Sequence, residues 1–251
     1  MNDVDLNILL PAFIAGLLVL ATHVPLGMKV LARGIIFADL AVAQIAGLGV
    51  VIAELLGAAE SPLAVQALAV ASALLGAALL ALIEHRLRDV QEACIGLLFV
   101  LAATGGILLM SHDPHAGEHI KDLLVGQILW VSNAQLMTTA ILTAVLLVLW
   151  RVFNQRLGTL GFYALFALAV TASVQLVGVY LVFASLIVPA LATYKMQQRR
   201  LPVAFMIGTA GYAAGLLLSV WLDLPSGAAI VWAMALAGTL AMLKKRRELQ
   251  I

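Results

Sequence analysis

A short polar stretch, SHDPHAGEHIKD at residues 111–122, gathers residue types that bind metal ions. It holds three of the five histidines and three of the thirteen acidic residues in the chain. Imidazole nitrogens and carboxylate oxygens together suit late first-row divalent ions. The candidate ligands are His112, Asp113, His115, Glu118 and His119.

Within this stretch, HAGEH has the H-x-x-E-H spacing of inverted zinc peptidases. Asp113 as N-cap and Pro114 at the first helical position would start a short helix, with His115 and His119 on one face. A peptidase also needs a third ligand and a catalytic domain around an open coordination position. The sequence predicts no such domain. Transient metal capture and a solvated loop without a specific role remain the two alternatives.

The composition predicts an all-α polytopic membrane protein. The chain has 251 residues, of which 64% are hydrophobic and 11% charged, whereas soluble domains keep about 25% charged residues. A membrane-spanning helix needs about 20 mainly apolar residues. Runs of this kind lie at 6–31, 35–57, 63–83, 94–110, 134–153, 159–194, 203–222 and 227–243. The run at 159–194 is long enough for a tight helix pair, so we expect nine spans in a single transmembrane domain, 1–251.

The basic residues predict the orientation. Thirteen of the fourteen Lys and Arg residues fall into five groups, at 29–33, 86–88, 151–156, 195–200 and 244–247. If 159–194 is a hairpin, all five groups lie on one side, which the positive-inside rule makes cytoplasmic. If it is one bent span, the group at 195–200 faces outward. We expect the hairpin, in a bacterial-type inner membrane, with the N-terminus outside and the C-terminus inside.

Polar residues inside predicted spans are candidates for a transport route, because an ionisable group there is costly. Asp39 is the clearest, and its alternative is a structural role as a cap or as a partner of Arg33. Gln44 either contacts substrate or bonds a neighbouring helix. His23 is either a ligand or a core histidine whose hydrogen bonds are satisfied.

Two interruptions in the apolar runs also point to a route. Pro189 lacks a backbone donor and should kink its helix, Gly178 allows the preceding turn, and the Ser185 hydroxyl is placed to bond the carbonyl that Pro189 frees. Broken helices of this kind often line the substrate routes of transporters; a kink that serves only helix packing is the alternative. The nine residues at 123–131, LLVGQILWV, are too short to cross and predict a re-entrant or interfacial segment with Trp130 near the lipid headgroups.

Several stretches together resemble the membrane permeases of zinc and manganese ABC importers. They are RGIIFADLAVAQIAGLG, EACIGLLFVLAATGGILLMS, DLLVGQILWVSNAQL, VGVYLVFASLIVPALAT and LLLSVWLDLPSGAAIVW, in that order between residues 23 and 243. The resemblance implies a type II importer fold, a homodimeric translocation path, two cytoplasmic ATP-binding subunits and an external metal-binding protein. The sequence has no phosphate-binding loop ending in Gly-Lys-Ser/Thr, so the ATPase is expected on another polypeptide.

The sequence departs from this family at two places. Many members carry a histidine one turn after the aspartate of the second span, whereas Asp39 is followed by Ala43 and Gln44. The family's cytoplasmic stretch after the fifth span resembles Phe-Asp-x-x-x-Ala-x-x-x-Gly. Here Asn154 replaces the acid in VFNQRLGTLGF, and about a dozen residues are missing before the next span. Either this docking element is trimmed, or another connection such as EHRLRDVQEA takes more of the contact with the ATPase. That contact is expected to use Arg86, Arg88, Arg151, Asn154 and Arg156.

These observations predict a permease subunit, not an enzyme, for an ATP-driven divalent metal importer. Zinc is the first choice of substrate, with manganese or iron as alternatives, and no permanently bound cofactor is expected. The metal residues would be Asp39, Gln44, His23 and the five ligands of the outer stretch. Lipid is an expected partner and nucleic acid is not, since the net charge is only +1. A secondary transporter or channel without an ATPase is the alternative function.

Overall fold

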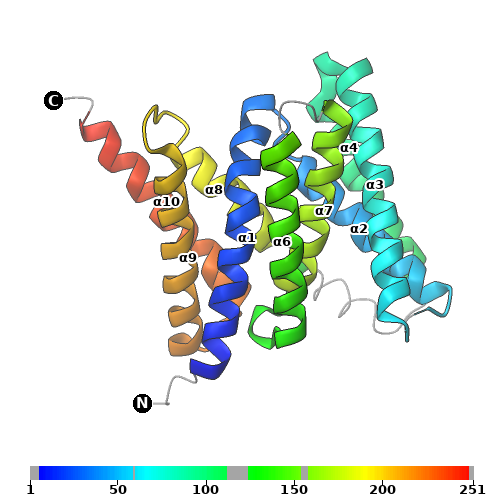
Figure 1. Ribbon diagram of the computed structural model, residues 1–251, viewed down its shortest axis with the longest axis horizontal. Helices are drawn as coiled ribbons and strands as arrows, with labels where there is room; N and C mark the ends of the chain where they lie inside the picture. Colours follow the sequence, from blue (N-terminus) through cyan, green and yellow to red (C-terminus); the bar gives the residue numbers. More distant parts are fainter. Residues whose placement is uncertain (1–5, 59, 112–123, 154–157, 249–251) are drawn as a thin grey trace. The chain divides into compact units, whose positions relative to one another are not determined.

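The structure, a computed structural model, describes residues 6–58, 60–111, 124–153 and 158–248. In these ranges it consists of α-helices with two short 3₁₀ turns and contains no strand, so the predicted all-α class is confirmed (Figure 1). The helices are α1 (Leu6–Arg33), α2 (Ala38–Leu55), α3 (Pro62–Arg86), α4 (Gln91–Leu109), α6 (Asn133–Phe153), α7 (Thr159–Val177), α8 (Val179–Ala192), α9 (Arg200–Leu222) and α10 (Ser226–Glu248). The 3₁₀ turns are η1 (Arg88–Val90) and η2 (Ile128–Trp130).

The helix lengths fit a multi-pass membrane protein. Among the described residues, eight helices are long and apolar enough to cross a bilayer, and α8 is a shorter apolar helix. The long run at 159–194 is divided into α7 and α8 by Gly178, whose φ of 79° lies in the left-handed region that favours glycine. The expected division of this run into two helices is therefore confirmed, and with it the prediction of about nine helices.

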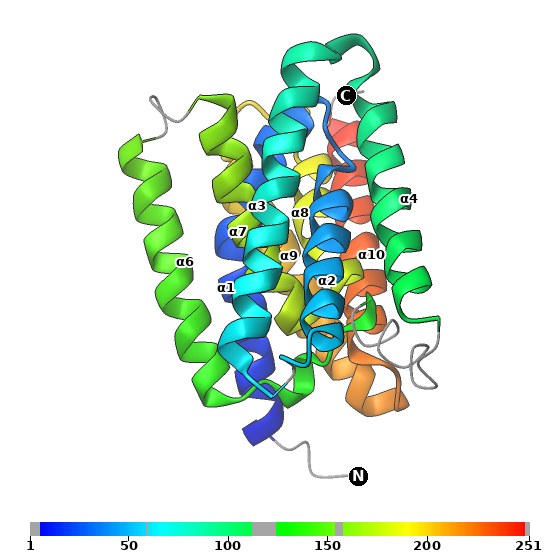
Figure 2. The same cartoon turned by 90° about the vertical axis from the view of Figure 1, so that its right-hand side faces the viewer.

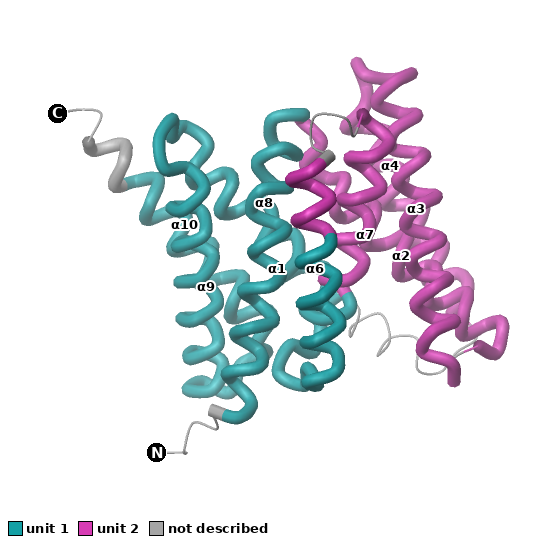
Figure 3. Tube along the Cα trace, viewed as in Figure 1, with its two compact units in different colours: residues 1–33, 124–145, 175–251 teal, residues 34–123, 146–174 magenta. Residues whose placement is uncertain are grey.

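The chain forms two compact units that are interleaved in sequence (Figure 3). Unit 1 comprises residues 1–33, 124–145 and 175–251, and unit 2 comprises residues 34–123 and 146–174. The division therefore falls inside two helices, near the middle of α6 and close to the end of α7. Neither unit is a contiguous sequence domain.

In unit 1, α1 packs against α8 and α9, and α10 packs against both α8 and α9. Gly27 lies so close to the Leu186 carbonyl of α8 that a β-carbon there would overlap it. Gly238 of α10 faces Val188 and Ala192 near the end of α8. The last turns of α1, α8 and α10 therefore lie at the same end of this unit, so the basic groups at 29–33 and 195–200 share that end, as the hairpin arrangement requires.

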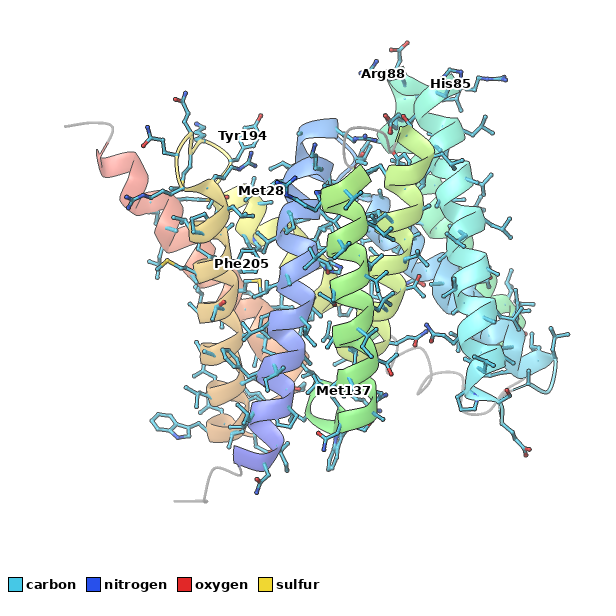
Figure 4. The ribbon with its side chains drawn as sticks, viewed as in Figure 1. Met28, His85, Arg88, Met137, Tyr194 and Phe205 are labelled. Carbon is cyan, nitrogen blue, oxygen red and sulfur yellow. The ribbon has the colours of Figure 1, made fainter. Side chains whose placement is uncertain are left out.

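In unit 2, α2 packs against both α3 and α4 (Figure 2). Gly49 permits close packing on α3, because its β-carbon position is only 2.6 Å from the Leu68 carbonyl oxygen. Small residues of this kind let membrane helices approach each other closely. At one end of the unit, His85 projects from the last turn of α3 and Arg88 from the connection between α3 and α4 (Figure 4).

The segment after residue 123 crosses the break between α7 and α8, backbone against backbone. Gly126 (φ 70°) lies against the main chain of Val177 and Gly178. Gly227, at the start of α10, lies with its β-carbon position 2.6 Å from the Val125 carbonyl oxygen. The segment continues into η2, where Ile128 is buried and Trp130 is exposed. The irregular backbone at Gly126 is thus covered by protein, as a segment at membrane depth requires.

Candidate metal route and coupling surface

Asp39 lies in the first turn of α2, and only 1% of its surface is exposed. Its Oδ1 atom is buried and accepts no hydrogen bond. The first turn of a helix carries free N–H groups and the positive end of the helix dipole, which favours a carboxylate. An unpartnered carboxylate oxygen in a membrane helix is nevertheless costly. This geometry makes Asp39 available as an oxygen ligand.

Gln44 lies on the same helix as Asp39 but on another side of it. Five residues correspond to about 140° around an α-helix, at 3.6 residues per turn. Gln44 is half-buried, whereas Ala43, four residues after Asp39, is buried on nearly the same side as Asp39. The α2 helix therefore presents one oxygen ligand, and not two, in the direction of Asp39.

His23 is fully buried in α1, and only one of its two ring nitrogens has a partner. Its Nδ1 atom lies 3.0 Å from the Val19 carbonyl oxygen and 2.9 Å from the Thr22 hydroxyl oxygen. A carbonyl oxygen only accepts, so Nδ1 carries the hydrogen and the neutral ring has its lone pair on Nε2. Histidines that bind metals are typically oriented in this way, with the other ring nitrogen donating to a carbonyl. The expectation of a fully satisfied core histidine is met only at Nδ1.

The predicted hydrogen bond of Ser185 is wrong. Pro189 removes the donor that would have bonded the Ser185 carbonyl, but the Ser185 hydroxyl instead donates to the Leu181 carbonyl at 2.7 Å. This leaves the hydroxyl oxygen free to accept from the Tyr212 O–H at 2.9 Å. Tyr212 of α9 is fully buried, and its ring lies against Gly16 of α1. Ser185 thus ties α8 to α9, and α8 remains helical through Pro189 to Ala192.

The polar outer stretch lies outside the described residues. This applies to all five of its predicted ligands: His112, Asp113, His115, Glu118 and His119. Across the described ranges, no three His, Cys, Asp or Glu side chains gather as a metal cluster. Asp39 belongs to unit 2 and His23 to unit 1.

Three of the five predicted coupling residues are described, and all three are exposed. Arg86 ends α3, Arg88 begins η1, and Arg151 lies in the last turn of α6. Asn154 and Arg156 lie outside the described residues. The exposed guanidinium groups are accessible to another protein at one end of unit 2.

The chain matches the profile of the ABC 3 transport family over residues 5–162 and 153–245. The chain belongs to the ABC 3 transport family. The resemblance to metal-importer permeases is therefore confirmed. As a permease of this family it is a transporter subunit and not itself an enzyme.

Relatives of this ABC 3 permease carry names that mention metals. The manganese transport system membrane protein MntC of Halalkalibacterium halodurans is 28% identical over 82% of this chain and 76% of its own length. The chelated iron transport system membrane protein YfeC of Yersinia pestis is 26% identical over 63% of this chain. The match covers 61% of YfeC, which is less than two thirds of its length.

Solved structures support the fold. PsaBC from Streptococcus pneumoniae, in complex with Fab, superposes with a TM-score of 0.70 over 94% of this chain and 89% of its own, at 20% identity. An inward-facing metal-chelate type ABC transporter superposes with a TM-score of 0.67 over 94% of this chain and 85% of its own, at 18% identity. The predicted type II importer fold is thus confirmed.

Two side chains of this ABC 3 permease make hydrogen bonds that could not be predicted from the sequence. The first two residues of α4, Gln91 and Glu92, hold bonds to α7 and to the start of α2. Both lie in the stretch EHRLRDVQEA that was expected to face the ATPase. Their partners are 72 and 55 residues away in sequence, so spacing along the chain cannot reveal them.

Proposed function

We propose that this permease carries a divalent metal ion across the inner membrane as part of an ATP-driven importer. Its family membership supports ATP-driven transport, and the names of its relatives support a metal substrate. The observation that carries the proposal is Asp39, a buried carboxyl group in α2 whose Oδ1 has no partner. A divalent cation in the route would supply the missing partner.

For the substrate we propose manganese or iron before zinc. The relatives named above are a manganese and a chelated iron transport protein. On α2 only an oxygen ligand points in the direction of Asp39, and oxygen ligands suit manganese. Zinc, the first choice from the sequence, remains a competing substrate, because the bare Nε2 of His23 is a nitrogen ligand that zinc would accept.

The proposed route begins at the polar stretch 111–122, which collects the ion outside. His112, Asp113, His115, Glu118 and His119 supply its ligands. The ion then passes Asp39 in unit 2. Gln44, on another side of α2, and His23, in unit 1, are further candidate contacts in the proposal, each considered within its own unit. The segment from Ser185 to Pro189 is the proposed lining element of unit 1.

The proposed assembly contains two copies of the chain, two cytoplasmic ATP-binding subunits and an external metal-binding protein. The whole chain acts as one transmembrane permease domain, with its N-terminus outside and its C-terminus in the cytoplasm. The exposed Arg86, Arg88 and Arg151 support contact with the ATPase, and Asn154 and Arg156 complete that surface in the proposal.

Uptake in reconstituted vesicles tests the function. The permease is co-purified with its ATPase subunits from its own membranes, reconstituted, and given Mn²⁺ with the external binding protein. We expect Mn²⁺ uptake that needs ATP and is inhibited by Fe²⁺ more strongly than by Zn²⁺. Stronger inhibition by Zn²⁺ would restore zinc as the substrate. Uptake that survives ATP depletion would contradict the importer and favour the secondary transporter.

A further inference from the structure

The start of α4 connects three parts of unit 2 through two adjacent side chains. Gln91 is 8% exposed, and its Nε2 donates to the Tyr163 hydroxyl at 3.1 Å. Glu92 follows it, and its Oε1 accepts the backbone N–H of Phe37 at 3.1 Å. Immediately before these residues lie the exposed arginines, Arg86 and Arg88, that the proposed ATPase contact uses.

Glu92 acts as the cap of α2 from a distant part of the chain. The N-cap residue of α2 is Phe37, which provides no side-chain hydrogen bond of its own. Helix N-termini leave N–H groups without partners and favour a negative charge. Glu92 supplies both the acceptor and the charge. Asp39 lies two residues after Phe37 in the same first turn, so a displacement of Glu92 that carries the Phe37 backbone with it also displaces Asp39.

Gln91 ties the same point to the start of α7. Its partner Tyr163 is fully buried. The rings of Tyr163 and Phe162 pack edge to face, with their centroids 5.4 Å apart. The Phe162 ring also packs edge to face with Trp150 of α6, with the ring centroids 6.1 Å apart. These aromatic side chains lie on both sides of the connection between α6 and α7. The start of α4 is therefore bonded to the N-cap residue of α2, the helix that carries Asp39, and to α7, the helix that follows the connection with Arg151.

A purely stabilising role explains Glu92 incompletely. Its second oxygen, Oε2, is buried and has no hydrogen-bond partner. Leaving a buried carboxylate oxygen without a partner is costly, whereas a Ser, Thr, Asp or Asn at position 37 itself would cap α2 locally. Capping alone therefore does not require a side chain 55 residues away.

We propose that Glu92 is a positioning residue that transmits movement of the α3–α4 connection to Asp39. The inference rests on the proposed ATP-driven transport. When the ATPase displaces the connection at residues 86–92, the bond between Glu92 and Phe37 moves the first turn of α2, and with it the carboxyl group in the metal route. Through its bond to Tyr163, Gln91 couples the same movement to α7.

The test measures metal transported per ATP hydrolysed in the reconstituted complex with Mn²⁺. Glu92→Ala removes the acceptor, and Glu92→Gln keeps an acceptor oxygen at nearly the same position. We expect Glu92→Ala to hydrolyse ATP while transporting about tenfold less Mn²⁺ per ATP, the factor that a hydrogen bond to a charged group supplies. We expect Glu92→Gln to keep the ratio within about twofold, since the acceptor oxygen is preserved.

The matched control is another helix cap in unit 2. Ser61 caps α3 through the Ala64 N–H, and Ser61→Ala should leave the transport ratio unchanged. If Glu92→Ala does not assemble, Phe37→Pro removes the donor of the same bond and should lower the ratio by the same factor. Where both assemble, combining them should give no further loss.

The outcomes separate this inference from the proposed function. A wild-type complex that does not couple ATP to uptake contradicts the proposed function itself. A coupled wild type with an unchanged ratio in Glu92→Ala, or in Phe37→Pro, contradicts only the role of Glu92. An equal loss of Mn²⁺ transported per ATP in Ser61→Ala also contradicts the role of Glu92, because weakening any helix cap in unit 2 would then lower this ratio.

Discussion

Replacing Asp39 by Asn should lower transport without lowering stability. The amide has nearly the shape of the carboxyl group and removes the charge. The Oδ1 of Asp39 accepts no hydrogen bond, so no such bond at this atom is lost. An isolated charge in a membrane helix costs about 3 kcal/mol at mid-depth. The helix dipole offsets up to about 1 kcal/mol of this near the first turn.

The expected change in the free energy of unfolding therefore lies between no change and a gain of about 2 kcal/mol, with the charge cost reduced near the helix end. The maximum rate of uptake should fall at least about tenfold at every metal concentration, since a divalent ion in the route loses its anionic ligand. Denaturant titration of the protein in detergent measures the free energy of unfolding. Initial rates of Mn²⁺ uptake over a concentration series measure the maximum rate.

Glu54→Gln is the matched control for Asp39→Asn, because it makes the same chemical change in the last turn of α2. It should alter neither quantity. One hydrogen bond contributes about 1 kcal/mol of net stability. If the Asp39→Asn variant loses more than this amount, the carboxylate has a structural role. An unchanged maximum rate would remove Asp39 from the route.

Three further predictions concern other parts of the chain. Replacing the three histidines between residues 112 and 119 by Ala should weaken uptake at limiting metal and leave it unchanged at saturation. Since ordinary histidine has a pKa of about 6.5 and binds metal only when neutral, wild-type uptake should approach that of the triple variant as the pH falls from about 7.5 to 5.5. Ser185→Ala should cost about 1–2 kcal/mol, because it leaves the buried Tyr212 hydroxyl unpaired, whereas Tyr212→Phe should cost about 0.5 kcal/mol. A cysteine at the exposed Gln198, in a chain with Cys94 replaced by Ser, should react with an impermeant reagent only from the cytoplasmic side.

Each of these has a contradicting result. If the triple variant and the wild type have the same uptake curves at both pH values, the outer stretch has no role in collecting the metal. A larger loss in Tyr212→Phe than in Ser185→Ala, measured by denaturant unfolding, would reverse the assigned donor and acceptor. Labelling of residue 198 from outside would refute the orientation.

The helices and the break at Gly178 could be predicted because they depend on local properties. Length and apolarity determine which runs can span a membrane, and a 36-residue run cannot be one ordinary span. If that run turns back, all five groups of basic residues lie on one side of the membrane, which favoured the hairpin over a single bent span. The structure places two of these groups, at 29–33 and 195–200, at the same end of unit 1, where α1 and α8 finish.

The bonds around the candidate site could not be predicted, because they join residues that are distant in sequence. The Ser185 hydroxyl had a local carbonyl and a distant phenol as possible partners, and the sequence did not indicate Tyr212. Glu92 looked like one charge among several in a cytoplasmic connection. Its role at the start of α2 depends on how α2 packs on α4, which no periodicity in either helix reveals.

The crossing of Gly126 over Gly178 restricts how this protein can change during evolution. Most tight contacts adapt by exchanging one side chain for another, and a loss of volume on one side is offset by a gain on the other. Here each glycine meets main-chain atoms of the other segment, and both have positive φ. No partner substitution can make room for a β-carbon, because the obstructing atoms are present in every residue type. A saturation library should therefore show two isolated intolerant positions without compensating second-site changes in their neighbours.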